Sequence, residues 1–248
     1  IRDVAVTGVQ TCALPIFQHA KRGRLRFTSH RDFQRAFERA LRRAEIPMAY
    51  SSGFSPHPRV SYANASPTGV ASEAEYVEIG VVQECDPQRV RTALQEVLPP
   101  GFDILDVVSA TTRDFVERLE ASHWQVEVPN VSVEQASRAI EKFLAAPEAM
   151  VTRRAKSGMR TFDTRAAVLR AEVIPVSQGA DEAEPCAIIA LVVRHGTPTV
   201  RPDDVLAALS KVADFTPPVP PRITRLAQGP LQDDGWSVGD PLAADRLP

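Results

Sequence analysis

Two stretches far apart in the chain share one helical pattern. Proline opens each stretch and apolar residues follow at matching offsets, in Pro87-x-x-Val90-x-x-Ala93-Leu94-x-x-Val97 and Pro202-x-x-Val205-x-x-Ala208-Leu209-x-x-Val212. Proline is well tolerated in the first turn of a helix, and this apolar spacing gives a helix one buried face. Each stretch follows an apolar, strand-like segment and precedes a Pro-Pro pair. The pattern therefore favours a tandem duplication.

The predicted order of elements supports that interpretation. In the first half we expect a strand over 17–28, a helix beginning at Ser29 and ending before Pro47, a strand over 76–82, a helix over 87–98 and a strand over 102–108. Short strands near 48–51 and 60–63 fill the region before residue 76, and one of them is taken as peripheral. This order is β-α-β-β-α-β, which is the order of a ferredoxin-like unit.

The second half repeats the order. Strands are expected near 123–128, 150–154, 168–174, 187–194 and 223–226, with helices after the Ser132–Gln135 capping box and from Pro202. The expected fold class is therefore α/β (α+β), with two tandem ferredoxin-like lobes at residues 17–111 and 119–230.

Both ends of the chain are expected to lie outside these lobes. Residues 1–16 resemble translated sequencing-adapter sequence, so we expect a non-native segment there, and the alternative is a strand around Val4–Val9. Residues 231–248 are rich in Asp, Gly and Pro and are expected to form a poorly ordered tail.

Composition excludes several classes of protein. Hydrophobic residues make up 44% of the chain and charged residues 24%, and no apolar run is long enough to span a membrane. The three cysteines, Cys12, Cys85 and Cys186, are widely spaced, which argues against a disulfide framework, a zinc site or an iron–sulfur site. We expect a soluble cytoplasmic protein with no metal site and no cofactor.

Positive charge is concentrated in one segment. Residues 17–45 hold nine basic and three acidic residues, a local charge of +6 in a chain whose net charge is −2. Arginines recur on one side of the first predicted helix, opposite its apolar face, where their guanidinium groups could bind phosphate. The alternative is an ordinary solvated face. The predicted anion- or RNA-binding residues are Arg24 and Arg26 on the preceding strand, and Arg31, Arg35, Arg39 and Arg42 on the helix. Aromatic residues make up only 6%, so base stacking has little support.

Two histidines are candidate catalytic residues. His30 lies at the predicted strand-to-helix turn, and His57 lies in a loop between Pro56 and Pro58. A titratable ring held in a stiff loop could act as a general acid or base. The alternative, which we favour, is a histidine that caps or packs.

The second lobe holds one comparable segment. Its polar residues around Gly158 are Lys156, Arg160, Asp163 and Arg165. They could form a clamp for an anion or a partner, or the tip of a hairpin with an internal Asp–Arg pair, and the sequence does not separate these alternatives.

Several motifs together resemble one family. They are Lys21-Arg-Gly-Arg-Leu-Arg-Phe-Thr-Ser-His-Arg-Asp-Phe33, Gly53-Phe-Ser-Pro-His-Pro58, Ser61-Tyr-Ala-Asn-Ala65, Thr68-Gly-Val-Ala-Ser-Glu-Ala-Glu-Tyr76, Arg160-Thr-Phe-Asp-Thr-Arg165 and Arg225-Leu-Ala-Gln-Gly229. The combination resembles the radical SAM-linked bacterial domain family of unknown function. The resemblance implies a radical SAM protein as partner, because the family occurs fused to such proteins or encoded beside them. It carries over no catalytic residues.

Three functions stay open at this point. The first is an accessory binding module that presents RNA or another anionic substrate to a radical SAM enzyme; the Cys-x-x-x-Cys-x-x-Cys motif of such enzymes is absent from this chain. The second is a metal-independent RNA-processing enzyme that uses His30 or His57. The third is a purely structural partner protein.

Overall fold

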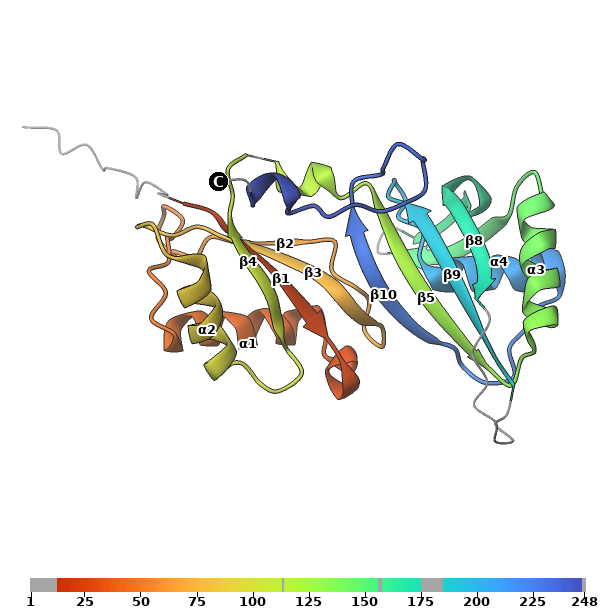
Figure 1. The fold of residues 1–248 in the computed structure, drawn as a ribbon, viewed down its shortest axis with the longest axis horizontal. Coiled ribbons are helices and arrows are strands. Elements are labelled where there is room, and N and C mark those ends of the chain that lie inside the picture. Colours follow the sequence, from red (N-terminus) through yellow and green to blue (C-terminus); the bar gives the residue numbers. More distant parts are fainter. Residues whose placement is uncertain (1–12, 113, 156–157, 175–184, 247–248) are drawn as a thin grey trace, which may run out of the picture. The chain divides into compact units, whose positions relative to one another are not determined.

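The computed structural model describes residues 13–112, 114–155, 158–174 and 185–246. The chain forms two compact units, one made of Ile1–Val116 with Leu242–Pro248 and the other of Glu117–Pro241. Each unit contains a set of strands paired antiparallel and two α-helices (Figure 1).

The first unit carries an antiparallel sheet with strand order β4-β1-β3-β2. Figure 1 shows both of its helices on the same side of this sheet. The elements are β1 (Pro15–Lys21), the 3-10 helix η1 (Gly23–Phe27), α1 (His30–Arg43), β2 (Val60–Ala63), β3 (Ala71–Ile79), α2 (Pro87–Val97), β4 (Ile104–Ser109) and the 3-10 helix η4 (Ala243–Asp245). The 3-10 helix η2 (Phe115–Arg118) spans the boundary between the units.

The apolar stripe of α1 forms the centre of this unit's core. Phe33, Phe37 and Leu41 are buried, and the Phe37 ring packs edge-on against Phe17 of β1 at a centroid distance of 5.8 Å. Burying one such side chain contributes roughly 1.5–3 kcal/mol. Phe17 lies opposite Val77 of β3, and this register turns both residues toward the same core.

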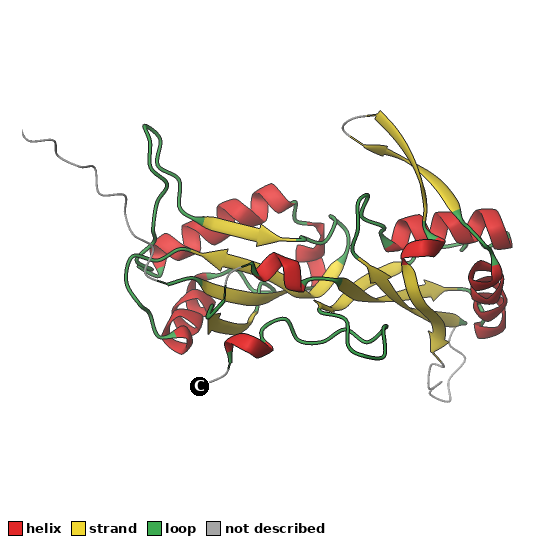
Figure 2. Cartoon of the chain, turned by 90° about the horizontal axis from the view of Figure 1, so that it is seen from above, coloured by secondary structure: helices red, strands yellow, loops and turns green. Residues whose placement is uncertain are grey.

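The second unit has strand order β10-β5-β9-β8, again with antiparallel neighbours. Its elements are β5 (Ala121–Pro129), α3 (Val133–Ala145), β6 (Met150–Ala155), β7 (Gly158–Asp163), the 3-10 helix η3 (Arg165–Ala167), β8 (Val168–Ile174), β9 (Cys186–Arg194), α4 (Pro202–Ala213) and β10 (Arg222–Gly229). Strands β6 and β7 pair only with each other among the described residues, and in Figure 2 they form the separate hairpin at the upper right.

The predicted α/β class is confirmed, and the helix starts agree with the sequence signals. Ser29 caps α1 by accepting a hydrogen bond from the amide of Asp32, and Ser132 and Gln135 form the expected capping box of α3. Proline occupies the first turn of both α2 and α4.

One strand is shorter than expected. The predicted strand over 17–28 ends at Lys21, and Arg24 and Arg26 lie in η1 instead. Gly23 adopts a left-handed conformation with φ of 52°, which stops the extended chain. The amides of Leu25 and Thr28 then close two tight turns on the carbonyls of Arg22 and Leu25.

The two ends also differ from expectation. The alternative strand around Val4–Val9 lies outside the described residues, but Pro15 and Ile16, expected to be non-native, belong to β1, and Ile16 is fully buried. The predicted tail contains Leu242, which is fully buried in the first unit, and Asp245, which accepts hydrogen bonds from the amide and hydroxyl of Thr111. Apolar burial and these bonds order a segment that its composition alone would leave loose.

Across the described residues, no helix has the length and apolar character needed to cross a membrane.

Candidate functional site

The start of the basic segment is held rigidly. Arg22 forms ion pairs with Glu73 and with Asp103, and these carboxylates raise the pKa of its guanidinium. The carbonyl of Arg26 accepts a hydrogen bond of 2.7 Å from the amide of Gly69. These contacts fix the position of η1 ahead of α1.

The helical arginines form the most distinctive charged surface of the first unit. Arg31, Arg35, Arg39 and Arg42 are all exposed on the side of α1 opposite Phe37. None of the four has an ion-pair partner among the described residues. We call these residues, together with Arg24 and Arg26, the basic surface. By contrast, Arg153 in the other unit is paired with Asp204.

The first turn of α1 contributes less to binding an anion than the arginines do. The Ser29 hydroxyl oxygen accepts from the Asp32 amide, and the hydroxyl donates to the Asp32 carboxylate at 2.7 Å. A carboxylate already lies at the positive end of the helix dipole, where it is stabilised. An anion at this surface would therefore be held mainly by guanidinium groups.

His30 opens α1 and packs against β2. Its Nε2 lies 3.1 Å from Nε2 of Gln34, and its ring meets Tyr62 edge-on at a centroid distance of 5.1 Å. The Tyr62 hydroxyl is buried without a hydrogen-bond partner among the described residues, and burial, assisted by the charge of Glu38, raises its pKa.

His57 lies elsewhere in the same unit. It is exposed in the loop before β2, where its amide donates to the Ser51 hydroxyl and its carbonyl accepts from the Ser51 amide. Among the described residues, the structure gives His30 and His57 no common hydrogen bond or ring contact. Within the described part of the chain, the two catalytic candidates are therefore not joined by a direct contact.

The second-lobe candidates divide into different roles. Lys156 lies outside the described residues, and Arg160 is exposed on β7. Asp163 accepts from the amides of Ala149, Arg165 and Ala166, and Arg165 donates to the carbonyls of Leu144 and Val168. Within the described part of the chain, Asp163 and Arg165 form no ion pair with each other, because both side chains bind backbone groups at the base of the hairpin.

A buried polar cluster in the first unit was not predicted. Lys21 donates to the carbonyls of Ser66 and Pro67, and Glu75 accepts from the amide of Ser66. Glu75 lies directly opposite His19 in the β1–β3 register, and both are buried. The only available sequence signal was the presence of charged residues within the strands. Among the described residues, no group of three or more His, Cys, Asp or Glu is arranged to hold a metal ion.

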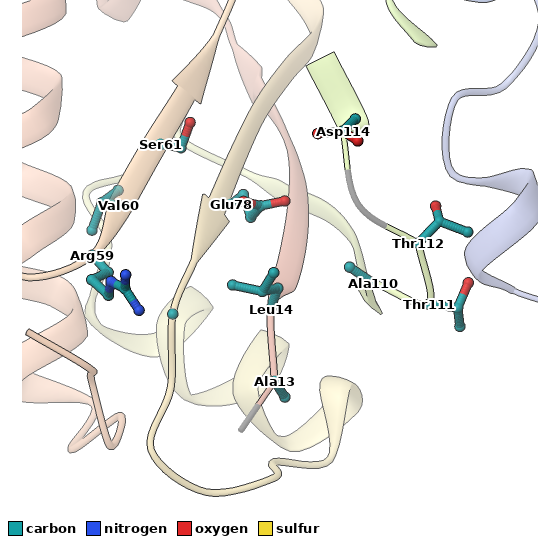
Figure 3. A pocket seen from close by; sticks show the side chains of 11 residues that line it. Ala13, Leu14, Arg59, Val60, Ser61, Glu78, Ala110, Thr111, Thr112 and Asp114 are labelled. Carbon is teal, nitrogen blue, oxygen red and sulfur yellow. The ribbon is translucent and has the colours of Figure 1, made fainter. Parts of the chain in front are cut away.

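A cavity of about 740 Å³ opens in the first unit (Figure 3). Its walls combine Arg59, Ser61 and Glu78 with apolar side chains that include Leu14 and Val60. Ser61 and Glu78 are cross-strand partners, which explains why both line it. The volume suits a small molecule, but none of the predicted site residues lines this cavity.

Comparison with known proteins identifies a family and finds solved structures that resemble the chain. Residues 16–202 match the family model described as uncharacterized protein conserved in bacteria (DUF2344). No curated protein matches the chain. A solved structure titled "Crystal Structure of a Cbf5-Nop10-Gar1 Complex" contains a chain with a TM-score of 0.44 and 10% identity. The alignment covers 92% of this chain and 51% of that one, so this chain spans about half its length.

Proposed function

The chain belongs to the bacterial family DUF2344, and we propose that it is an accessory binding module that presents RNA or another anionic substrate to a separate radical SAM enzyme. One observation carries the binding part of this proposal: the exposed arginines of α1 have no ion-pair partners among the described residues. The enzyme partner rests on the resemblance of the sequence motifs to radical SAM-linked proteins.

The arrangement is unfavourable for an isolated helix. Arg39 has Arg35 and Arg43 four residues away and no acidic residue three or four positions away, and like charges at that spacing destabilise a helix by about 0.2–0.5 kcal/mol per pair. A polyanion would reverse this effect, since each guanidinium can bind a phosphate with two parallel hydrogen bonds. Repulsion in the free protein and attraction in the complex both favour an anionic ligand.

The enzymatic alternative has weaker support. General acid–base catalysis needs a base within hydrogen-bond reach of the group that it deprotonates. The ring of His30 meets Tyr62 edge-on and its hydrogen-bond partner among the described residues is the amide of Gln34, whereas His57 lies in the loop before β2. Binding therefore accounts for the surface better than catalysis does.

We also propose that the two units are ferredoxin-like lobes related by duplication. The strand orders β4-β1-β3-β2 and β10-β5-β9-β8 support this, because each places the last strand beside the first. The matched proline starts of α2 and α4 support it as well. On this reading the β6–β7 hairpin is an insertion after the first helix of the second lobe.

The binding proposal is tested by reversing charge on the basic surface. The double variant Arg35→Glu, Arg39→Glu should bind a short RNA more weakly, and its affinity should depend less on salt, because phosphate contacts release counterions. The matched control is Arg89→Glu, Arg138→Glu, which makes the same change in net charge at exposed positions on α2 and α3. Equal affinities for the two folded double variants, or no RNA binding by the parent, would exclude this function.

The partner is tested separately. We expect a tagged chain purified from its native host to bring with it a protein that carries the Cys-x-x-x-Cys-x-x-Cys motif, identified by mass spectrometry. If the chain binds RNA but no such protein copurifies with it, the radical SAM partner is rejected and the RNA-binding part of the proposal stands.

A further inference from the structure

Phe27 is an aromatic residue left in solvent beside the basic surface. Of its surface, 60% is exposed, and the guanidinium carbon of Arg26 lies 4.8 Å from the centre of its ring. A single exposed apolar residue is ordinary in a folded protein. The position of Phe27 is what distinguishes it, because it separates Arg26 from the Ser29 cap of the arginine-bearing helix.

The backbone beneath Phe27 is fixed. Leu25 packs against the core of the unit and lies against Gly101, where an added Cβ would come within 3.0 Å of the Leu25 side chain. The amide of Thr28 donates to the Leu25 carbonyl, and the Gly69 amide donates to the Arg26 carbonyl. Phe27 is therefore presented on an anchored turn, which reduces the entropy cost of binding to it.

We infer that Phe27 and Arg26 form a stacking platform for a base of single-stranded RNA, while the phosphates on either side of that base contact the arginines of α1. The inference rests on the proposed function and names its substrate class. Proteins that bind single strands combine a positively charged track with aromatic rings on which bases stack. In a double helix, the bases are already stacked on one another and are less available to a side chain.

The low aromatic content of the chain does not oppose this inference. Stacking of one base needs one suitably placed ring, and alanine substitution of such a ring typically costs about 1–3 kcal/mol per base. The arginines beside Phe27 complement the uniform negative charge of RNA. A protein surface of mixed charge would not need so many positive charges. A protein partner is the competing occupant.

The experiment compares three single variants of the full chain. Phe27→Leu removes the aromatic ring but keeps an apolar side chain, Phe27→Trp keeps an aromatic face, and Phe54→Leu makes the same change at a fully exposed phenylalanine in the loop before β2. The probes are a short oligouridine RNA and inorganic polyphosphate, each titrated at several salt concentrations.

We expect Phe27→Leu to weaken oligouridine binding by about 5- to 150-fold, which is the stacking energy converted to affinity. Phe27→Trp and Phe54→Leu should bind like the parent, and polyphosphate affinity should be unchanged in all three variants. The salt dependence of Phe27→Leu should equal that of the parent, because no phosphate contact is lost.

Failure of this inference differs from failure of the proposed function. Parent-like RNA binding by Phe27→Leu, together with weaker binding by Arg35→Glu, Arg39→Glu, would overturn the platform and leave the basic surface intact. If Phe27→Leu keeps its RNA affinity but loses the radical SAM partner, the ring makes a protein contact. That result would also overturn the stacking platform. No RNA binding by the parent would reject both.

Discussion

The Ser122 hydroxyl oxygen lies 2.7 Å from Nε2 of His195, and Nδ1 of the same ring lies 2.6 Å from the carbonyl oxygen of Leu119. Because a carbonyl can only accept, Nδ1 carries the ring proton and Nε2 accepts the proton of the hydroxyl. These bonds join the start of β5 to the residue after β9. Burial is the main cause that lowers the pKa of His195, and its bond to Leu119 partly opposes that effect.

The lowered pKa predicts a pH dependence of stability. As pH falls below about 6.5, the unfolded chain takes up a proton at His195 before the folded chain does, so the free energy of unfolding decreases. The contribution of neutral His195 to the free energy of unfolding is complete above its pKa in the unfolded chain. It is lost as pH falls through its pKa in the folded chain. The pKa of His123 is also lowered, mainly by burial, so this residue also makes the protein less stable as pH falls.

Urea unfolding between pH 7.5 and pH 5.5 measures this effect. His195→Gln should be less stable than the parent at pH 7.5 and should lose less stability on acidification. A parent whose stability is flat over this range would contradict the argument.

A second prediction concerns the cost of the basic surface. Arg39→Glu replaces two repulsive four-residue spacings, to Arg35 and Arg43, with two attractive ones. We expect the variant to be more stable than the parent by about 1 kcal/mol at low salt, with the gain disappearing at high salt. The same variant should bind RNA more weakly. Denaturant titrations at two salt concentrations give the first result, and a stability gain that survives high salt would show another cause.

A third prediction separates the residues at the base of the β6–β7 hairpin from its exposed part. Asp163→Ala removes the acceptor for three backbone amides and should lower stability by about 1–3 kcal/mol. Arg160→Ala, at an exposed position on β7, should change stability by less than about 0.5 kcal/mol. Thermal or chemical unfolding compares the two variants, and equal stabilities would show that the carboxylate is dispensable.

A fourth prediction tests the C-terminal segment. Asp245→Ala removes the acceptor for the amide and hydroxyl of Thr111 and should cost about 1–3 kcal/mol. The matched truncation is Asp233→Ala, at an exposed position in the predicted tail, and it should leave the exchange of that amide unchanged. Hydrogen exchange at the Thr111 amide should accelerate in the first variant, and an unchanged exchange rate would mean that this bond is not formed in solution.

Sequence periodicity predicted the helices well, because their signals are local. The apolar stripe of α1 and the serine caps of α1 and α3 each depend on residues three or four positions apart. The exposure of Arg35 and Arg39 followed from the same helical spacing. The order of the strands depends on pairings between distant residues, such as Phe17 with Val77, which no local signal predicts.

Features that depend on distant contacts were not predictable. Leu25 and Phe27 alternate as in a strand, but the chain turns at Gly23, so Phe27 is exposed while Leu25 packs inward. The role of Lys21 depends on Pro67, and no local pattern connects them. In the same way, the sequence predicted Asp163 as a candidate binding residue, although its partners are backbone amides brought close by folding.

The first unit is assembled from two segments of sequence, and the second lies wholly between them. During synthesis, every residue of the second unit leaves the ribosome before Asp245 can reach Thr111. The second unit can therefore finish folding first. Until Leu242 is synthesised, the larger segment of the first unit lacks one side chain of its core. The last contacts of the first unit can therefore form only after the whole second unit has been synthesised, although the first unit begins earlier in the chain.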